Sequence, residues 1–233
     1  MSATTPHCGR GASAGRGSLR RVGHLLSANA GSAREIEWRG RRERSGIDKR
    51  PVPGDVAVGR LGLTGDVQVD TAHHGGPEQA VYAYAAEDLA LWAERLEREL
   101  LPGSFGENLT LSGVDVTEAR IGERWRIGSV LLEIGDVRIP CLTFQTWLQE
   151  PTWVRRFTQE ARPGAYLRVL EGGQLRAGDP VEVVETRDHD VTVGLMFRAV
   201  TTERALLPRL LVEPRVRHEA LATAREYAAS VPS

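Results

Sequence analysis

Residues 130–141 read Val130-Leu131-Leu132-Glu133-Ile134-Gly135-Asp136-Val137-Arg138-Ile139-Pro140-Cys141. The aliphatic and β-branched run is typical of a β-strand, and the Arg-Ile-Pro-Cys tetrapeptide closes it. The only other cysteine, Cys8, lies in a Gly/Ser/Arg-rich leader. A thiol that follows an arginine and a proline turn is typical of a metal-bound or nucleophilic thiolate, because a nearby cation lowers the thiol pKa. The alternative is that Cys141 is a small buried hydrophobic residue.

Further strand-like segments lie on both sides of this stretch. They cover residues 22–28, 55–62, 79–84, 124–127, 129–135, 165–170 and 180–186. Gly-containing turns separate many of them. Because the strands alternate little with helices, we expect a mainly β protein with helices, built on a closed barrel rather than a doubly wound sheet.

Helical patterns occur in two places. Residues 85–100 place Leu89, Trp92 and Leu96 on one face, and the Pro-Gly pair at 102–103 predicts the helix end. After residue 186, Thr192 predicts a cap for a helix over 193–199 and Thr201 for one over 202–212, with a third over 215–229. Pro208 is expected to kink or restart the second of these helices.

The predicted organisation has three parts. Residues 1–21 form a leader that we expect to be disordered, because it has almost no large apolar side chains. Residues 22–187 form the barrel domain, and residues 188–233 form a small three-helix appendage. An appendage of this size is expected to need the barrel for its stability.

Composition excludes several classes of protein. The 233 residues are 41% hydrophobic and 26% charged with a net charge of −1, so no basic field favours nucleic acid or an anionic membrane. No apolar run approaches the ~20 residues of a membrane span. The twin arginines at 20–21 precede an apolar segment that is too short for an export signal. We therefore expect a cytoplasmic protein without an intramolecular disulfide framework, and its oligomeric state is not predicted.

The segment His73-His74-Gly75-Gly76-Pro77 is a candidate ligand loop. Two glycines let the backbone approach a ligand closely, and their N–H groups can form an anion nest. His74 could donate a hydrogen bond to a phosphate or oxo group. The alternative is an ordinary glycine-rich turn.

Two other segments carry polar side chains. Phe105-Gly106-Glu107-Asn108-Leu109 resembles a loop that lines a polar pocket, although an asparagine turn is the simpler explanation. Lys49-Arg50-Pro51 offers two adjacent cations that suit a phosphate, although solvated loop charges are commoner. Lys49 is the single lysine among 30 basic residues.

Several chemistries have no motif in this chain. CxxC, HExxH, P-loop and GxGxxG patterns are all missing from the sequence. One cysteine outside the leader cannot hold an iron–sulfur cluster, which takes about four protein ligands.

Taken together, the segments are similar to the MOSC domain family, named for the C-terminal domain of molybdenum cofactor sulfurases. The similarity runs in consistent order from about residue 22 to 186, through residues 46–52, 61–70, 74–77, 80–84, 105–109, 121–123, 138–141 and 178–180. The three-helix tail resembles that of the bacterial stand-alone branch. The chain departs from the pattern at Asp136, at Val137 in place of a usual proline, and at Glu123 in place of a usual aspartate. We expect these departures to reshape the substrate pocket and to leave the metal ligand intact.

The resemblance implies a closed, pyruvate-kinase-barrel-like β-barrel that binds a molybdopterin cofactor. It implies Cys141 as the thiolate ligand of molybdenum, and a reaction that reduces N-hydroxylated compounds such as amidoximes and hydroxylaminopurines. Around the cofactor it implies His74, Gly75, Gly76, Asn108, Lys49, Arg50 and Arg138, the last three as cations for the phosphate or the oxo groups. His74 and Glu107 are the candidate proton donors. Electrons would come from a separate flavoprotein or ferredoxin-type reductase, because the chain has no relay of its own.

Three other functions remain open from the sequence. Cys141 could carry a persulfide in sulfur transfer, which needs an exposed thiol. The barrel could be a non-catalytic binding module. It could also bind pyridoxal phosphate, for which Lys49 is the sole Schiff-base candidate.

Overall fold

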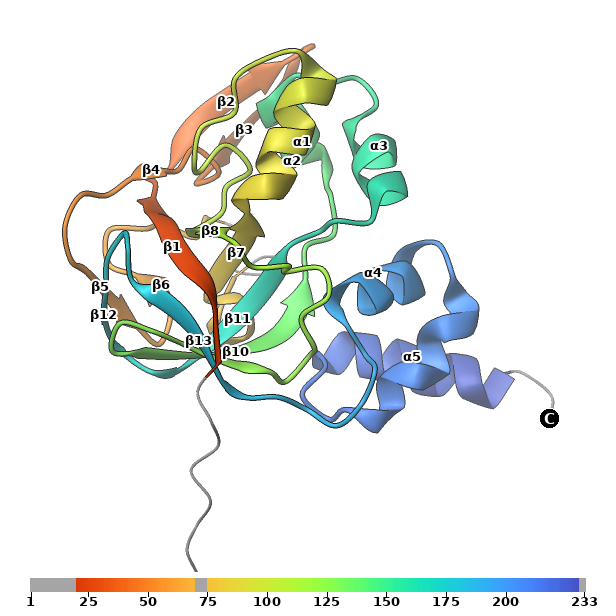
Figure 1. The fold of residues 1–233 in the computed structure, drawn as a ribbon. Helices are drawn as coiled ribbons and strands as arrows, with labels where there is room; N and C mark the ends of the chain where they lie inside the picture. The colour runs from red at the N-terminus through yellow and green to blue at the C-terminus, as the bar shows by residue number, and fades with distance from the viewer. Residues whose placement is uncertain (1–19, 70–74, 231–233) are drawn as a thin grey trace, which may run out of the picture.

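The computed structural model describes residues 20–69 and 75–230, and its centre is a closed β-barrel (Figure 1). Around the barrel the strand order is β13-β9-β10-β11-β7-β8-β1, and β13 pairs back onto β1 to close it. The strands are β1 (Arg20–Ala30), β7 (Val81–Ala85), β8 (Leu109–Ser112), β9 (Arg124–Ile127), β10 (Val130–Val137), β11 (Ala165–Glu171) and β13 (Pro180–Glu185). Neighbours are antiparallel except β7 and β8, which are parallel and are joined through helix α1 (Ala86–Leu96). The predicted mainly β barrel is confirmed.

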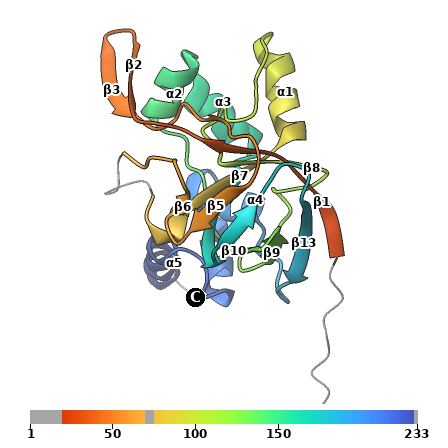
Figure 2. The same ribbon diagram turned by 90° about the vertical axis from the view of Figure 1, so that its left-hand side faces the viewer.

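Smaller strands decorate the barrel. β4 (Arg50–Pro51) extends the sheet at the end of β1, while β5 (Val56–Gly59), β6 (Gly62–Leu63) and β12 (Gly173–Leu175) form a separate sheet. A hairpin of β2 (Arg34–Trp38) and β3 (Arg41–Ser45) projects away from the barrel beside the helices (Figure 2). The strand predicted over 55–62 is therefore two short strands. The one predicted over 79–84 begins with the 3-10 turn η1 (Pro77–Gln79) before β7.

Two hydrophobic clusters stabilise the fold. The barrel interior is filled by fully buried aliphatic side chains, among them Leu25, Leu111, Ile127, Leu167 and Val181. An aromatic cluster lies between α1 and two helices that the sequence did not predict, α2 (Leu142–Leu148) and α3 (Trp153–Glu160). Its rings are Trp92, Phe105, Phe144, Trp153 and Phe157, and many of them meet edge to face.

Helix α1 ends earlier than predicted. Leu89 and Trp92 are buried and Leu96 is half-buried, as the pattern indicated. The helix stops at Leu96 because Glu97 adopts the left-handed conformation, with φ of 52°, and its N–H turns back to Ala93 and Glu94. The Pro-Gly pair lies in the following loop and does not end the helix.

The C-terminal appendage consists of α4 (Val193–Thr201), the 3-10 helix η2 (Arg204–Val212) and α5 (His218–Ser230). Thr192 caps α4 as predicted, because its hydroxyl accepts the Leu195 N–H at 3.1 Å. The prediction for Thr201 was wrong, since it is the last residue of α4 and its hydroxyl bonds back to Phe197. Pro208 lies inside an element that is 3-10 throughout.

The appendage packs onto the barrel rather than standing apart. Phe197 of α4 is fully buried and lies 6.4 Å from the Phe157 ring of α3. β1 begins at Arg20, two residues before the predicted start of the barrel domain. The predictions for residues 1–19 fall outside the described residues. None of the helices in the described residues is long and apolar enough to cross a membrane.

Candidate functional site

A cavity of about 260 Å³ lies beside β7, β10 and β11. Loops that are distant in sequence converge on it, because β7, β10 and β11 are neighbours in the barrel. Of the predicted site residues, it brings together Lys49, Gly75, Asn108, Arg138 and Cys141 on its wall. We call it the site cavity.

Cys141 lies at the start of α2, directly after the buried turn residue Pro140. Its backbone is extended, with φ of −126° and ψ of 174°, and its carbonyl accepts the Gln145 N–H at 3.1 Å. The residue is partly exposed, so the thiol is accessible from the site cavity. This placement suits a thiolate that binds a metal or attacks a substrate.

Arg138 is held between two aromatic rings on the cavity wall. Only 9% of its surface is exposed, and its guanidinium carbon lies 4.9 Å from the Tyr82 ring and 4.3 Å from the Phe144 ring. Within residues 20–69 and 75–230 no carboxylate pairs with it and no hydrogen bond satisfies it. Burial alone would lower the pKa of Arg138, but Tyr166, Tyr82 and Cys141 together raise it above its ordinary value. The cavity therefore contains a charged, buried guanidinium that lacks an anion.

Lys49 is equally buried but is paired. Its ammonium contacts both carboxylate oxygens of Asp66 at 2.5 Å. Burial lowers the pKa of Lys49, and the charge of Asp66 opposes that lowering. Asp66 in turn accepts the Gly31 N–H at 3.0 Å, which fixes the carboxylate. An anion that reached Lys49 would have to share it with Asp66.

Asn108 connects the strands around the cavity. Its side-chain oxygen accepts the Tyr82 N–H at 3.1 Å, and its amide nitrogen donates to Asp66 at 2.9 Å and to the Asn29 carbonyl at 3.3 Å. These bonds use both ends of the amide. The structure therefore gives Asn108 a positioning role behind the Lys49–Asp66 pair.

Glu107 lies behind the wall and does not line the site cavity. It is fully buried, and its two oxygens accept the Gly103 N–H at 2.6 Å, the Phe105 N–H at 3.0 Å and the Thr110 hydroxyl at 2.8 Å. Burial raises the pKa of Glu107, and these hydrogen bonds oppose the rise. Glu107 thus anchors its own loop, a placement that does not support its predicted role as a proton donor.

The Gly75-Gly76 turn is held by glutamines rather than open to an anion. The Gly75 N–H donates to Gln79 Oε1 at 3.0 Å, and the Gly76 N–H donates to Gln68 Oε1 at 2.8 Å. Gly75 has φ of 103°, and a Cβ there would lie 2.3 Å from Gln68 Oε1, so this position requires glycine. Gly75 lies on the cavity wall whereas Gly76 does not line it, and the N–H groups of both are already satisfied.

Two further predicted residues are not placed at the cavity. Arg50 is absent from its wall, with 62% of its side chain exposed, and it pairs with Asp48 at 2.8 Å. It is therefore a surface cation in this structure. His74 lies outside the described residues.

Two tyrosines of the cavity wall were not among the predicted site residues. Tyr82 and Tyr166 come from neighbouring strands, and their ring centroids are 5.1 Å apart. Burial raises the pKa of Tyr166, while Arg138 opposes the rise. Both tyrosines look like core residues in an alternating strand pattern, so only the observed convergence on Arg138 identifies them.

The described residues fit a cofactor that carries its own metal ligands and an anionic group. Within residues 20–69 and 75–230, no group of three or more His, Cys, Asp or Glu side chains could hold a metal ion. A metal at Cys141 would thus need further ligands from a cofactor or from outside these ranges. Arg138 supplies the unpaired cation that a phosphate requires.

Comparisons with known proteins identify the family to which this fold belongs. The MOSC domain model matches residues 70–182. The uncharacterized protein YflK of Bacillus subtilis is 33% identical over 174 residues, which is 75% of this chain and 79% of that protein. A protein of Gibberella moniliformis named "Reductase" is 30% identical over 169 residues, which is 70% of this chain but 29% of that protein. The crystal structure of YiiM from Geobacillus stearothermophilus aligns with a TM-score of 0.73 and 26% identity, over 88% of this chain and 98% of that one.

The resemblance that the sequence motifs indicated is thereby confirmed. The family model matches residues 70–182, which include β7 to β11 and the start of β13, and YflK matches over most of both chains. This chain belongs to the MOSC domain family.

Proposed function

We propose that this protein is a molybdenum-cofactor-dependent oxidoreductase that reduces N-hydroxylated compounds. One observation carries the proposal: an accessible thiol, Cys141, shares a cavity with Arg138, a buried guanidinium without a carboxylate partner in the described residues. Membership of the MOSC family and the relative named "Reductase" support an oxidoreductase.

The residues of the site cavity would have different roles in this reaction. Cys141 provides the thiolate ligand, and Arg138 binds the cofactor phosphate through its planar donor fork. The Lys49–Asp66 pair and Asn108 hold the opposite wall in place. When bound, the molybdenum centre would supply the two-electron chemistry that removes the hydroxyl oxygen from nitrogen.

Reduction of an N–OH group to N–H consumes two electrons and two protons and releases water. The electrons come from a separate flavoprotein or ferredoxin-type reductase, because the sequence has no cluster or flavin motif. With Glu107 tied into its own loop, Tyr166 is our candidate, among the hydroxyl side chains of the described cavity wall, for passing a proton inward. Burial raises the pKa of Tyr166, and its neighbour Arg138 opposes that rise by favouring the ionised form.

The test is the molybdenum and pterin content of the wild type and of Cys141→Ser, both purified from a molybdenum-replete host. We expect near-stoichiometric metal in the wild type and its loss from the variant, followed by reduction of benzamidoxime when a reductase is added. A well-folded wild type with neither metal nor pterin would rule the proposal out. Persulfide labelling of Cys141 would then test sulfur transfer.

Pyridoxal phosphate receives no support from a specific observation. The Lys49 ammonium is bound by Asp66, whereas a Schiff-base lysine needs a neutral, accessible amine. An aldimine absorbance band that is lost in Lys49→Ala would favour that alternative.

A further inference from the structure

A second cavity of about 310 Å³ lies between the barrel and the helical appendage. Figure 1 shows α4 and α5 on the side of the barrel where β10 and β11 lie. Three residues, Gln79, Ile139 and Tyr166, line both this cavity and the site cavity. We call it the seam cavity.

The seam cavity is within reach of a substrate that reacts at Cys141. Ile139 precedes Cys141 by two residues, so their Cα atoms are at most about 7 Å apart. Ile139 lines both cavities and is 45% exposed, so we describe its side chain as the ridge between them. A ring of benzene size spans about the same distance. A molecule with one end at Cys141 can therefore place its other end over the ridge.

Charged groups of the seam cavity come from both the barrel and the appendage. Asp136 of β10 accepts the Gln79 amide at 2.7 Å and the Arg217 guanidinium at 3.2 Å. Arg217 also pairs with Glu219 of α5 at 2.8 Å. Two carboxylates thus face one guanidinium, which leaves an excess of negative charge when both are ionised. An anion would meet this excess, whereas a cation or an N–H donor would be attracted.

Apart from Thr223, the rest of the lining is apolar or aromatic. Met196 and Val200 come from α4, Ala220 comes from α5, and Tyr166 contributes its ring from the barrel. Such a surface suits a flat, carbon-rich group with polar atoms at one edge. Because the appendage contributes much of this lining, substrate binding would give it a role beyond stability.

We propose that the seam cavity binds the non-reacting end of the substrate and selects flat groups that are neutral or cationic over anionic ones. This inference rests on the proposed function, because it assumes that the reaction occurs at Cys141. It also gives a consequence to Asp136, one of the positions at which the chain departs from the family pattern.

Three probes of similar size but different charge test the selectivity: benzamidoxime, 4-(aminomethyl)benzamidoxime and 4-carboxybenzamidoxime. We expect kcat/KM for the neutral and cationic probes to exceed that for the anionic probe at least tenfold. Calorimetric titration of the cofactor-loaded protein without an electron donor measures Kd in the absence of turnover. The Kd values should rank the three probes in the same way as kcat/KM does. Equal values for the cationic and anionic probes, within twofold, would overturn the inference.

Two variants locate the selectivity. Ala220→Phe fills the seam cavity and should weaken binding of benzamidoxime about tenfold without changing the molybdenum content, whereas Ala228→Phe on the exposed part of α5 should change neither. Glu219→Gln removes one carboxylate and should reduce the preference for the cationic probe several-fold, with the exposed Glu226→Gln as the control. Since Glu219 is largely exposed, this variant keeps the test valid if Ala220→Phe fails to fold.

The two levels of proposal fail differently. A wild type without molybdenum, or unable to reduce any of the probes, would contradict the proposed function. A loaded, active wild type whose binding is unchanged in Ala220→Phe and Glu219→Gln would contradict only the assignment of the seam cavity.

Discussion

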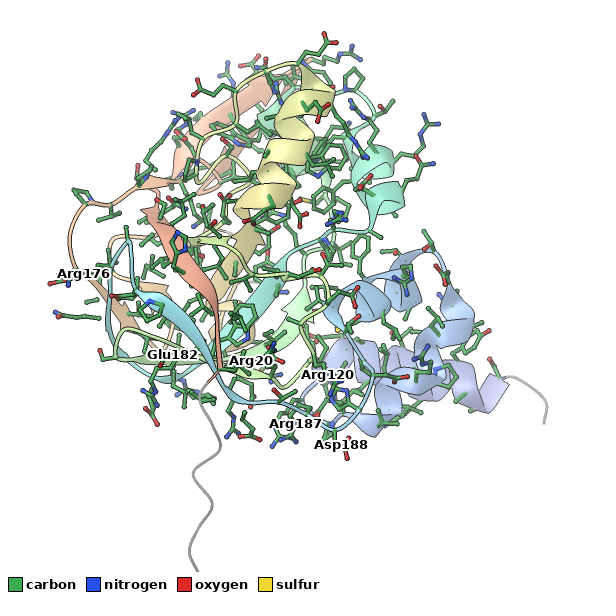
Figure 3. The ribbon with its side chains drawn as sticks, viewed as in Figure 1. Arg20, Arg120, Arg176, Glu182, Arg187 and Asp188 are labelled. Atoms are coloured by element: carbon green, nitrogen blue, oxygen red, sulfur yellow. The ribbon has the colours of Figure 1, made fainter. Side chains whose placement is uncertain are left out.

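Arginines occur in two regions of this barrel, and their partners differ. Between the barrel and the appendage, Arg168, Arg187 and Arg215 surround Glu133 and Glu213, and we call this group the arginine seam. Figure 3 labels Arg187 where the chain leaves β13 for the appendage. On the wall of the site cavity, Arg138 lies over the rings of Tyr82 and Phe144 and has no carboxylate partner in the described residues.

The difference separates a structural cation from a binding one. Glu133 and Glu213 are 6% and 2% exposed, and each forms ion pairs with more than one arginine. The charges of the arginine seam are therefore balanced inside the fold. Arg138 is 9% exposed without such balance, and cation–π contacts of about 0.5–2 kcal/mol do not replace a lost hydration shell. An anion that enters the site cavity from outside would balance the charge of Arg138. The predictions below change one side of this contrast at a time.

The largest effect is expected from Glu213→Gln. This change leaves Arg187, Arg215 and His189 facing a neutral amide, and removing one member of a buried ion pair costs about 3–5 kcal/mol. We expect a loss near the lower value, because the two arginine side chains are 22% and 30% exposed. Urea unfolding measures it, with Glu182→Gln on β13 as the control. Equal stability of the two variants would show that the arginine seam does not hold the appendage on the barrel.

Glu107→Gln tests a buried carboxylate whose charge is opposite to that of Arg138. Glu107 is buried like Arg138, but three donors satisfy its oxygens. A glutamine would turn an N–H group toward one of these donors, at a cost of about 1–3 kcal/mol. Thermal unfolding against the exposed control Glu94→Gln measures the loss. A neutral outcome would mean that hydrogen bonding does not distinguish Glu107 from Arg138.

A smaller, pH-dependent effect follows from Glu213. Burial alone would raise the pKa of Glu213, but the Arg215 N–H and the guanidinium groups of Arg187 and Arg215 lower it below its ordinary value of 4.5. Since the folded pKa lies below the unfolded one, the stabilisation is complete above about pH 5 and is lost as the pH falls through the folded pKa. The difference in stability between the wild type and Glu213→Gln should therefore shrink below about pH 4.5. A difference that grows on acidification would have the wrong sign.

Much of the barrel could be predicted from the sequence, because its strands are short aliphatic and β-branched runs separated by glycine turns. β8 was missed because its four residues, Leu109–Ser112, directly follow a polar loop. Helices α2 and α3 were missed because seven- and eight-residue helices barely complete an amphipathic repeat. Propensity could not predict that η2 is a 3-10 helix around Pro208.

The site was predicted unevenly for a physical reason. Cys141, Arg138, Lys49, Gly75 and Asn108 were found because reactive or unusual residue types are visible in a sequence. Their partners were not: Asp66 looked like part of a turn, and Tyr82 and Tyr166 looked like core strand residues. Contacts between residues far apart in the chain decide whether a side chain binds a ligand or holds a loop, as Glu107 shows.

The most direct test of the unpaired guanidinium compares Arg138→Gln with Arg168→Gln in cofactor-free protein, with and without inorganic phosphate. Without phosphate, Arg168→Gln should lose about 2 kcal/mol because Glu133 and Glu78 lose a partner, whereas Arg138→Gln should be neutral or more stable by up to about 1 kcal/mol. Phosphate at ten times its Kd should stabilise the wild type and Arg168→Gln by about 1.4 kcal/mol and leave Arg138→Gln unchanged. If Arg138→Gln instead keeps the full phosphate effect, or is destabilised as much as Arg168→Gln, then Arg138 is not the anion site of this protein.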